Sequence, residues 1–197
     1  MGTMDIKEYA YENSIPIIQD EGLNLLLETI KNNNVVNILE LGTAIGYSAI
    51  SIAKKYPHVM IDTIERDNDL YVEAYNNILA KRLQHKIIPY NMDIKDYTSE
   101  KIYDLIFVDA AKSQYLNYLE QFYDNLKIDG IYFFDNMEFH GLVDKPELCT
   151  NRNTKQLVKK IKRFYDIIIN DKRFKVFYYK NIGDGILILK KKEKDNE

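Results

Sequence analysis

Acidic and amide side chains directly follow two apolar runs in the second half of the chain. The run YDLIFV ends at Asp109, and the run IYFF ends at Asp135 and Asn136. If both runs are parallel strands of one sheet, their carboxyl ends meet at the same edge. Two carboxylates and an amide oxygen form a hard-oxygen ligand set that suits Mg²⁺ and leaves positions open for water and substrate. The alternative is that each aspartate separately caps a helix.

A glycine-containing segment follows an earlier apolar run, VVNILEL. Gly42 and Gly46 permit a tight turn and a close backbone approach, and Ser48 stands where the following helix begins. The dinucleotide pattern GxGxxG is not met, because Ala44 and Tyr47 occupy the places of its second and third glycines. This spacing favours a ligand that carries an adenosine without a pyrophosphate.

Other polar residues at the ends of apolar runs fit the same ligand. Glu65 follows the second run, where a carboxylate can accept both ribose hydroxyls; a solvent-facing acid is the plainer interpretation. Met92 and Asp93 follow the third run, in the position that flanks an adenine ring. Glu40 could hold the amino end of an amino-acid-bearing nucleoside or simply cap the turn. Together these residues describe a pocket for S-adenosylmethionine better than one for a nicotinamide cofactor.

Lys112 lies three residues past Asp109. Near a divalent cation and a sulfonium its ammonium form is disfavoured, so the side chain could act as a general base. A surface lysine is the alternative.

The elements that must position these residues alternate between strand and helix patterns. This alternation predicts an α/β, doubly wound, mostly parallel seven-stranded sheet with an antiparallel C-terminal hairpin. A helix over 20–31 carries a leucine-rich stripe that could pack on the sheet or form a dimer face. Strands are expected at 35–41, 59–64, 86–90, 103–108, 131–134, 174–179 and 186–189, and further helices at 48–55, 67–82, 115–126 and 152–170.

Composition indicates a cytoplasmic protein with one domain. The 197 residues are 46% hydrophobic and 29% charged, which fits a globular chain with a full core. A single cysteine excludes an intrachain disulfide and a four-cysteine zinc site. The N-terminus lacks a signal-peptide pattern, and no apolar run approaches the ~20 residues that span a bilayer. We expect one domain over 1–197, with a helical arm at 1–33, a catalytic core at 34–190 and a charged tail at 191–197.

Charge is distributed unevenly along the chain. Residues 1–150 hold 13 basic and 24 acidic side chains, whereas residues 151–175 hold nine basic and two acidic ones, a net charge of +7. Such segregation can mark the site of an anionic partner. A solvated helix face that balances an acidic body explains the charge equally well.

The motifs ILELGTAIGYS, TIER, FVDAAKSQY and DN resemble the cation-dependent O-methyltransferases related to the catechol and caffeoyl-CoA methyltransferases, over roughly residues 35–190. The resemblance implies a Rossmann-like class I methyltransferase fold, a homodimer, and S-adenosylmethionine with Mg²⁺ (or Mn²⁺ or Ca²⁺) as cofactors. It further implies that Asp109, Asp135 and Asn136 bind the metal while Lys112 takes the hydroxyl proton. The implied cofactor-binding residues are Ile18, or its neighbour Ile17, with Glu40, Gly42, Gly46, Ser48, Glu65, Met92, Asp93 and Asp109.

A second set of motifs points to one branch of this family. IPIIQDEG, DAAKSQY, DNMEFHGLV, LVKKI and GDGILILKK look like bacterial tRNA 5-hydroxyuridine methyltransferases, which produce 5-methoxyuridine at the wobble position. The absence of tryptophan departs from catechol-type pockets. A small catechol-like phenol is the alternative substrate. Five basic residues could contact phosphates of the tRNA anticodon region: Arg152, Lys155, Lys159, Lys160 and Arg163.

Overall fold

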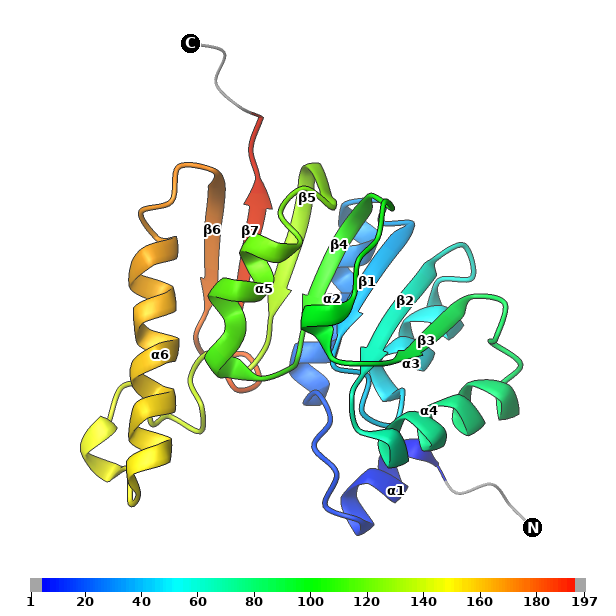
Figure 1. Ribbon diagram of the computed structural model, residues 1–197, viewed down its shortest axis with the longest axis horizontal. Helices are drawn as coiled ribbons and strands as arrows, with labels where there is room; N and C mark the ends of the chain where they lie inside the picture. Colours follow the sequence, from blue (N-terminus) through cyan, green and yellow to red (C-terminus); the bar gives the residue numbers. More distant parts are fainter. Residues whose placement is uncertain (1–4, 194–197) are drawn as a thin grey trace.

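Seven strands form one mixed sheet, shown in Figure 1. The structure is a computed structural model that describes residues 5–193. Its strand order is β3-β2-β1-β4-β5-β7-β6; the first five strands run parallel, and β7 lies antiparallel to both β5 and β6. The predicted doubly wound sheet with its C-terminal hairpin is therefore confirmed. The strands are β1 (Asn37–Leu41), β2 (Met60–Glu65), β3 (Ile87–Asn91), β4 (Tyr103–Val108), β5 (Leu126–Phe134), β6 (Phe174–Tyr179) and β7 (Ile186–Lys191).

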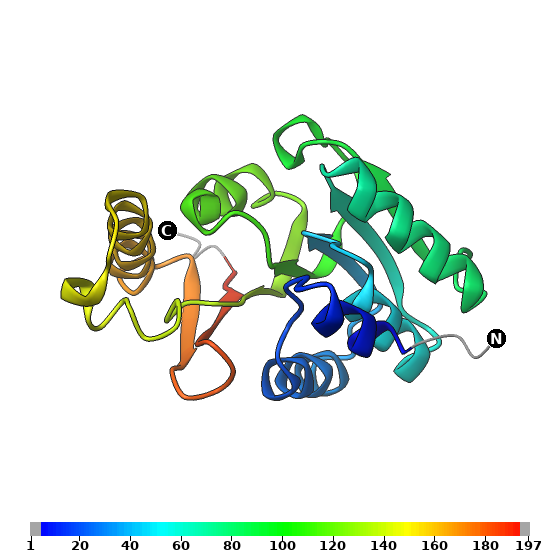
Figure 2. The same cartoon turned by 90° about the horizontal axis from the view of Figure 1, so that it is seen from below.

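Helices cover both faces of this sheet. Figure 2 shows α2 on one side and α5 with α6 on the other. The helices are α1 (Ile6–Glu12), α2 (Asp20–Asn32), α3 (Tyr47–Lys55), α4 (Asn68–Ala80), α5 (Tyr115–Gln121) and α6 (Arg152–Ile168), with short 3₁₀ turns η1 (Ile94–Asp96), η2 (Lys112–Gln114) and η3 (Pro146–Leu148).

The central strands are apolar on both sides because each side faces a helix layer. In β4, Leu105 and Phe107 pack into the core under α2 and α3, whereas Ile106 and Val108 pack into the core under α5 and α6. Alternate residues of a strand point to opposite faces, so a strand covered on both faces needs a continuous apolar run. This explains why YDLIFV reads as a strand without polar alternation.

The leucine-rich stripe of α2 faces the sheet. Leu23, Leu26, Leu27 and Ile30 are all buried in the same core as Ile38 of β1. Between the two possibilities that the sequence leaves open, the structure therefore selects packing on the sheet.

Two predicted boundaries are wrong. The helix expected at 115–126 ends at Gln121, and β5 begins at Leu126 instead of at 131. Asp129 has a φ of 61°, and the register between β5 and β4 shifts at this end of the strand. The Asp129-Gly130 pair, whose residue types are typical of a tight turn, thus lies inside an irregular strand. Leu126 is apolar and would be buried either as the last residue of a helix or as the first residue of a strand. The apolar pattern therefore could not distinguish these two arrangements.

Among residues 5–193, no helix combines the length and the apolar character that crossing a membrane requires.

Candidate active site

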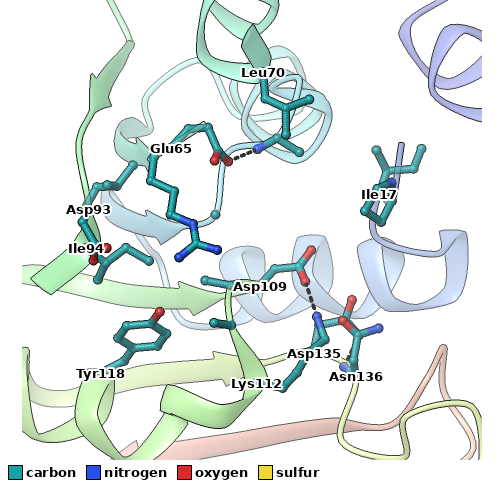
Figure 3. A pocket seen from close by; sticks show the side chains of 17 residues that line it. Ile17, Glu65, Leu70, Asp93, Ile94, Asp109, Lys112, Tyr118, Asp135 and Asn136 are labelled. Atoms are coloured by element: carbon teal, nitrogen blue, oxygen red, sulfur yellow. Dashed lines mark hydrogen bonds and ion pairs between the residues drawn. The ribbon is translucent and has the colours of Figure 1, made fainter. Parts of the chain in front are cut away.

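A cavity of about 400 Å³ opens at the carboxyl ends of the parallel strands. Figure 3 shows residues from the ends of several strands converging on it. This is the edge at which open α/β sheets bind ligands, because the loops there diverge and leave a crevice. The walls are formed by Pro16, Ile17, Gly42, Ala44, Ile64, Glu65, Arg66, Leu70, Asp93, Ile94, Asp109, Ala110, Ala111, Lys112, Tyr118, Asp135 and Asn136.

Four of the predicted residues meet at one side of this cavity. Asp109 and Lys112 follow β4, and Asp135 and Asn136 follow the neighbouring strand β5; Figure 3 shows their side chains together. The Lys112 Nζ lies 3.5 Å from the Asp109 Oδ1. The backbone N–H of Asn136 donates a hydrogen bond of 2.7 Å to the Asp135 Oδ1. The structure therefore brings together all three predicted metal ligands and the predicted base.

Removal from water raises the pKa values of Asp109 and Asp135. Burial and the negative charge of Asp109 raise the pKa of Asp135 to about 7, although the Asn136 N–H and Lys112 oppose the shift. Burial also raises the pKa of Asp109, against the attraction of Lys112. A buried carboxyl group (Asp135) and a half-buried one (Asp109) beside one lysine leave an excess of acidic groups, which a divalent cation would balance.

The ligand set relies on an amide. Within residues 5–193, no three His, Cys, Asp or Glu side chains are grouped so that they could hold a metal ion. A cation at this site would take two carboxylates from Asp109 and Asp135 and a third protein oxygen from the carboxamide of Asn136. Such hard-oxygen sets fit Mg²⁺, which keeps several waters and often binds through one or two carboxylates.

Glu65 occupies a different part of the cavity (Figure 3). The Glu65 Oε2 accepts a hydrogen bond of 3.0 Å from the backbone N–H of Ala44, and its Oε1 accepts one of 2.9 Å from that of Asp67. Two backbone donors thus orient the carboxylate at the end of β2. Asp93 also lines the cavity, so the predicted ribose and adenine positions lie in one space.

Gly42 is required where β1 and β4 end side by side. Its φ is +102°, and an added Cβ would lie 2.3 Å from the backbone oxygen of Asp109. The Asp109 N–H donates to the Leu41 carbonyl over 2.9 Å, which joins the two strand ends. The glycine therefore allows the close approach that positions the Asp109 backbone.

Two predicted cofactor residues lie in the interior. Glu40 is fully buried, and its carboxylate accepts hydrogen bonds from the hydroxyls of Ser48 and Thr63. Burial raises the pKa of Glu40 to about 7. Gly46 adopts the left-handed conformation that begins α3, and an added Cβ there would face Ala74. Neither Glu40 nor Gly46 contributes to the cavity wall.

Three further predicted cofactor residues, Ile18, Ser48 and Met92, lie outside the wall of the main cavity. Ser48 and Ile18 border a small adjoining pocket, which they share with Thr43. Met92 packs against the core under α5 and is not part of the cavity wall. Its neighbour Asp93 is therefore the wall residue from the end of β3.

Sequence reasoning missed some wall residues. Tyr118 of α5 is 8% exposed, and Arg66 and Leu70 reach the wall from the β2–α4 connection. Tyr118 stands at helical spacing among apolar residues, so its pattern indicates only core packing. Arg66 directly follows Glu65, and this adjacency is the one signal that could have identified it.

The five basic residues lie on α6, outside the cavity wall. The opposite face of α6 is buried through Val158, Ile161, Phe164 and Ile168. In Figure 1 the yellow start of α6 lies toward the same end of the molecule as the ends of β4 and β5. The exposed set is Arg152, Lys155, Lys159, Lys160 and Arg163.

Comparison with known proteins identifies the family. Residues 3–192 match the O-methyltransferase family over nearly the whole chain. The chain belongs to this family. A caffeoyl-CoA O-methyltransferase of Nicotiana tabacum is 30% identical to this O-methyltransferase family member over 192 residues, with 87% of this chain and 74% of the relative covered. One of Populus kitakamiensis is 28% identical, with 90% and 78% covered.

Solved structures agree with this membership. A caffeoyl-CoA O-methyltransferase-like protein of Staphylococcus aureus superposes with a TM-score of 0.91 at 32% identity, covering 94% of this chain and 90% of its own. An O-methyltransferase of Bacillus cereus, solved in complex with SAH, superposes with a TM-score of 0.78 at 21% identity, covering 94% and 88%. The fold is thus that of class I methyltransferases, as the motif resemblance implied.

Proposed function

We propose that the chain is an S-adenosylmethionine- and divalent-cation-dependent O-methyltransferase that methylates 5-hydroxyuridine at the wobble position of tRNA. One observation carries the chemistry: Asp109, Asp135 and Asn136 line the same cavity beside Lys112. A hydroxyl adjacent to a second oxygen could chelate a cation held by these three residues and present its proton to Lys112. The cavity then needs room for the methyl donor, which the Glu65 side supplies.

The cofactor would lie between the Glu65 end and the metal ligands. Glu65 would accept the ribose hydroxyls, Asp93 and Ile94 would border the adenine, and Ile17 of the N-terminal arm would close over the cofactor. The SAH complex of the Bacillus cereus protein, which has the same fold, supports this class of ligand.

The chain's own residues carry the proton and the positioning. When bound, the cation acidifies the substrate hydroxyl and S-adenosylmethionine supplies the methyl group. Lys112 would accept the hydroxyl proton on Nζ, which lies 3.5 Å from the Asp109 Oδ1. The substrate oxygen would give up its proton to Lys112 and take the methyl group, and the donor's sulfur would keep the electron pair of the broken carbon–sulfur bond. Alignment of the two reactants in one cavity supplies much of the rate.

The tRNA assignment rests on a local charge pattern and the motif resemblance. 5-Hydroxyuridine carries adjacent oxygens at O4 and O5, so it meets the chelation requirement. α6 offers six exposed basic side chains, the five predicted ones and Lys162, beginning near the edge of the sheet that holds the cavity (Figure 1). Phosphate contacts from such a face would position an RNA without reading its sequence.

A catechol-like phenol is the second candidate substrate. The curated relatives, at 28–30% identity, are named for caffeoyl-CoA, whose caffeoyl ring carries two adjacent hydroxyls. This chemistry would use the same ligands and the same base, and the basic face of α6 would have no role in it.

The metal chemistry is tested by removing one ligand. We expect Asp135→Ala to lower methyl transfer at least about a hundredfold, because the lost ligand and the lost cation remove several kcal/mol of transition-state stabilisation. Treatment of the wild-type enzyme with EDTA should have the same effect, and added Mg²⁺ should reverse it. The measurement is transfer of labelled methyl from S-adenosylmethionine. Full activity after either treatment contradicts a metal mechanism.

The substrate is tested in cells and with the purified enzyme. Mass spectrometry of tRNA nucleosides from cells that lack the gene should show loss of 5-methoxyuridine and accumulation of 5-hydroxyuridine. The purified enzyme should methylate that tRNA and turn over caffeic acid much more slowly. Unchanged 5-methoxyuridine in the deletion strain would instead favour the phenol.

A further inference from the structure

The loop that follows β5 has an unusual backbone. Asn136, Phe139 and His140 have φ values of 60°, 46° and 59°, and Gly141 has a φ of 76°. Left-handed conformations are uncommon for residues other than glycine, so surrounding contacts must hold this loop in place. The loop begins with a proposed metal ligand, so these contacts bear on the active site.

The β6–β7 hairpin supplies those contacts, chiefly through Asp184. Its side chain is buried, with only 6% of the residue exposed. The Asp184 Oδ1 accepts a hydrogen bond of 2.6 Å from the backbone N–H of His140, and its Oδ2 accepts a longer one of 3.4 Å from the Asn136 Nδ2. The Asp184 carbonyl also accepts from the Glu138 N–H over 2.8 Å. One residue thus contacts the loop at three points.

The hairpin must approach the loop closely for these bonds to form. Gly185 has a φ of +81°, and an added Cβ would lie 2.9 Å from the Glu138 backbone nitrogen. The backbone oxygen of Gly185 accepts a hydrogen bond of 2.9 Å from the Met137 N–H. This packing explains Asp184 and Gly185 of the hairpin, which the catalytic chemistry by itself does not use.

The contact between Asp184 and Asn136 has a chemical consequence. A carboxylate only accepts hydrogen bonds, whereas a carboxamide has one end that donates and one that accepts. The NH₂ of Asn136 must therefore face Asp184, and its carbonyl oxygen must face away. Asn136 lines the cavity beside Asp135 (Figure 3), and Asp184 is not part of the wall.

We propose that Asp184 is a positioning residue that fixes the polarity of the Asn136 carboxamide, so that its oxygen and not its nitrogen is presented to the divalent cation. The inference rests on the proposed metal dependence. Hydrogen-bond partners behind metal ligands commonly change metal affinity by about 10- to 100-fold. Here the partner would decide whether the third protein ligand is available at all.

The test is the Mn²⁺ affinity of the full-length Asp184→Asn variant, measured by titration calorimetry. The carboxamide introduced at position 184 keeps an oxygen for the His140 N–H and turns an NH₂ toward Asn136, whose own carboxamide must then reverse. We expect Mn²⁺ binding to weaken about 10- to 100-fold. Tyr178→Phe is the matched control, because it removes the Tyr178 hydroxyl bond to Glu138 in the same loop without touching Asn136. It should bind Mn²⁺ within about threefold of wild type.

A second substitution separates polarity from simple loosening of the loop. When Asp184→Asn is combined with Asn136→Asp, the new carboxylate accepts from the carboxamide introduced at position 184 and again presents an oxygen to the cation. Asn136→Asp should raise the Mn²⁺ affinity at least tenfold more in the Asp184→Asn background than in wild type. A coupling of this size is typical of two residues in direct contact in a double-mutant cycle. Equal gains in both backgrounds would overturn the inference.

The remaining outcomes are also decisive. A wild-type chain that binds no Mn²⁺ overturns the proposed metal dependence and this inference with it. Wild-type binding that Asp184→Asn leaves unchanged overturns only the inference. Should Asp184→Asn fail to fold, NMR of the wild-type chain replaces it: with Mg²⁺ bound, the Asn136 NH₂ protons should remain protected from solvent exchange. Free exchange of those protons would contradict the proposal.

Discussion

At the scale of single residues, Glu40 is an interior acid, unlike Asp109 and Asp135, the proposed catalytic acids. Its carboxyl group lies inside the protein between the hydroxyls of Ser48 and Thr63, whereas Asp109 and Asp135 line the cavity. All three acids lie within one residue of the end of an apolar strand, so nearness to a strand end does not distinguish them. Burial raises the pKa of Glu40 to about 7. The raised pKa gives this interior acid a measurable signature.

We predict that the free energy of unfolding of the metal-free protein falls as the pH rises from about 4.5 to 7. A group whose pKa is higher in the folded state favours folding while it is protonated, and this contribution is lost as the pH rises through the folded-state pKa. Glu40→Gln should remove that part of the slope and gain roughly 3 kcal/mol at pH 7, since one pKa unit corresponds to about 1.4 kcal/mol. Urea unfolding at several pH values measures the free energy of unfolding of the wild type and of Glu40→Gln.

Glu28→Gln, on the exposed face of α2, is the control for this measurement. It removes an acid of the same type and should leave the pH dependence as in wild type. A Glu40→Gln curve that parallels wild type between pH 4.5 and 7 would contradict the assigned cause.

At the scale of elements, the loops after β1, β4 and β5 build the site because their strands are neighbours. The order β1-β4-β5 places the Gly42 turn against the Asp109 backbone and places Asp109 beside Asp135. The contact between β1 and β4 leaves no space for a side chain at Gly42. The position of the Asp109 backbone thus depends on a turn 67 residues away along the chain.

We predict that Gly42→Ala destabilises the protein by about 3 kcal/mol and abolishes methyl transfer, because the new Cβ would lie 2.3 Å from the Asp109 backbone oxygen. Gly141→Ala is a matched control: its φ is also positive, at +76°, but an added Cβ there meets nothing within 4 Å. Gly141→Ala should lower the free energy of unfolding by only about 1 kcal/mol, the cost of a left-handed backbone conformation for a residue with a Cβ. Denaturant unfolding measures the loss of stability in both variants. Equal losses would show that the clash at Gly42 does not affect stability.

At the scale of the whole molecule, opposite charges are separated in space. The acidic body holds the cavity, and the exposed face of α6 holds a basic cluster at the β5–β7–β6 end of the sheet, away from β3 (Figure 1). An anionic polymer would be repelled by the body and attracted by α6, which favours one orientation of a bound RNA.

We predict that replacing Lys159, Lys160 and Arg163 together by Ala weakens tRNA binding, most strongly at low salt. Each lost phosphate contact should reduce the slope of log affinity against log salt by up to about 0.9. Filter binding over a salt series measures this slope. The control removes three exposed basic residues from α3 and from the turn that follows α4, namely Lys54, Lys55 and Arg82, and should keep most of the wild-type slope. Equal slopes in all three proteins would leave the phenol as the better candidate.

Much of this molecule could be predicted from local sequence. The strand YDLIFV, the hairpin strands and the helix that begins at Arg152 follow from periodicity and caps, because burial on one or two faces imposes a local pattern. Parallel strand order then indicated which residues reach the shared edge, and Asp109, Lys112, Asp135 and Asn136 do line one cavity. Their roles in catalysis stay predictions.

Only the tertiary structure decided what faces the cavity and what faces the core. Glu40 stands next to last in β1 and Glu65 stands last in β2, yet Glu40 is enclosed by hydroxyls and Glu65 is held by backbone donors at the cavity wall. Tyr118 and Asp184 gain their positions from elements distant in sequence. A local sequence pattern can predict whether a side chain is buried. Which residues contact that side chain depends on the packing between elements, and a local pattern does not predict it.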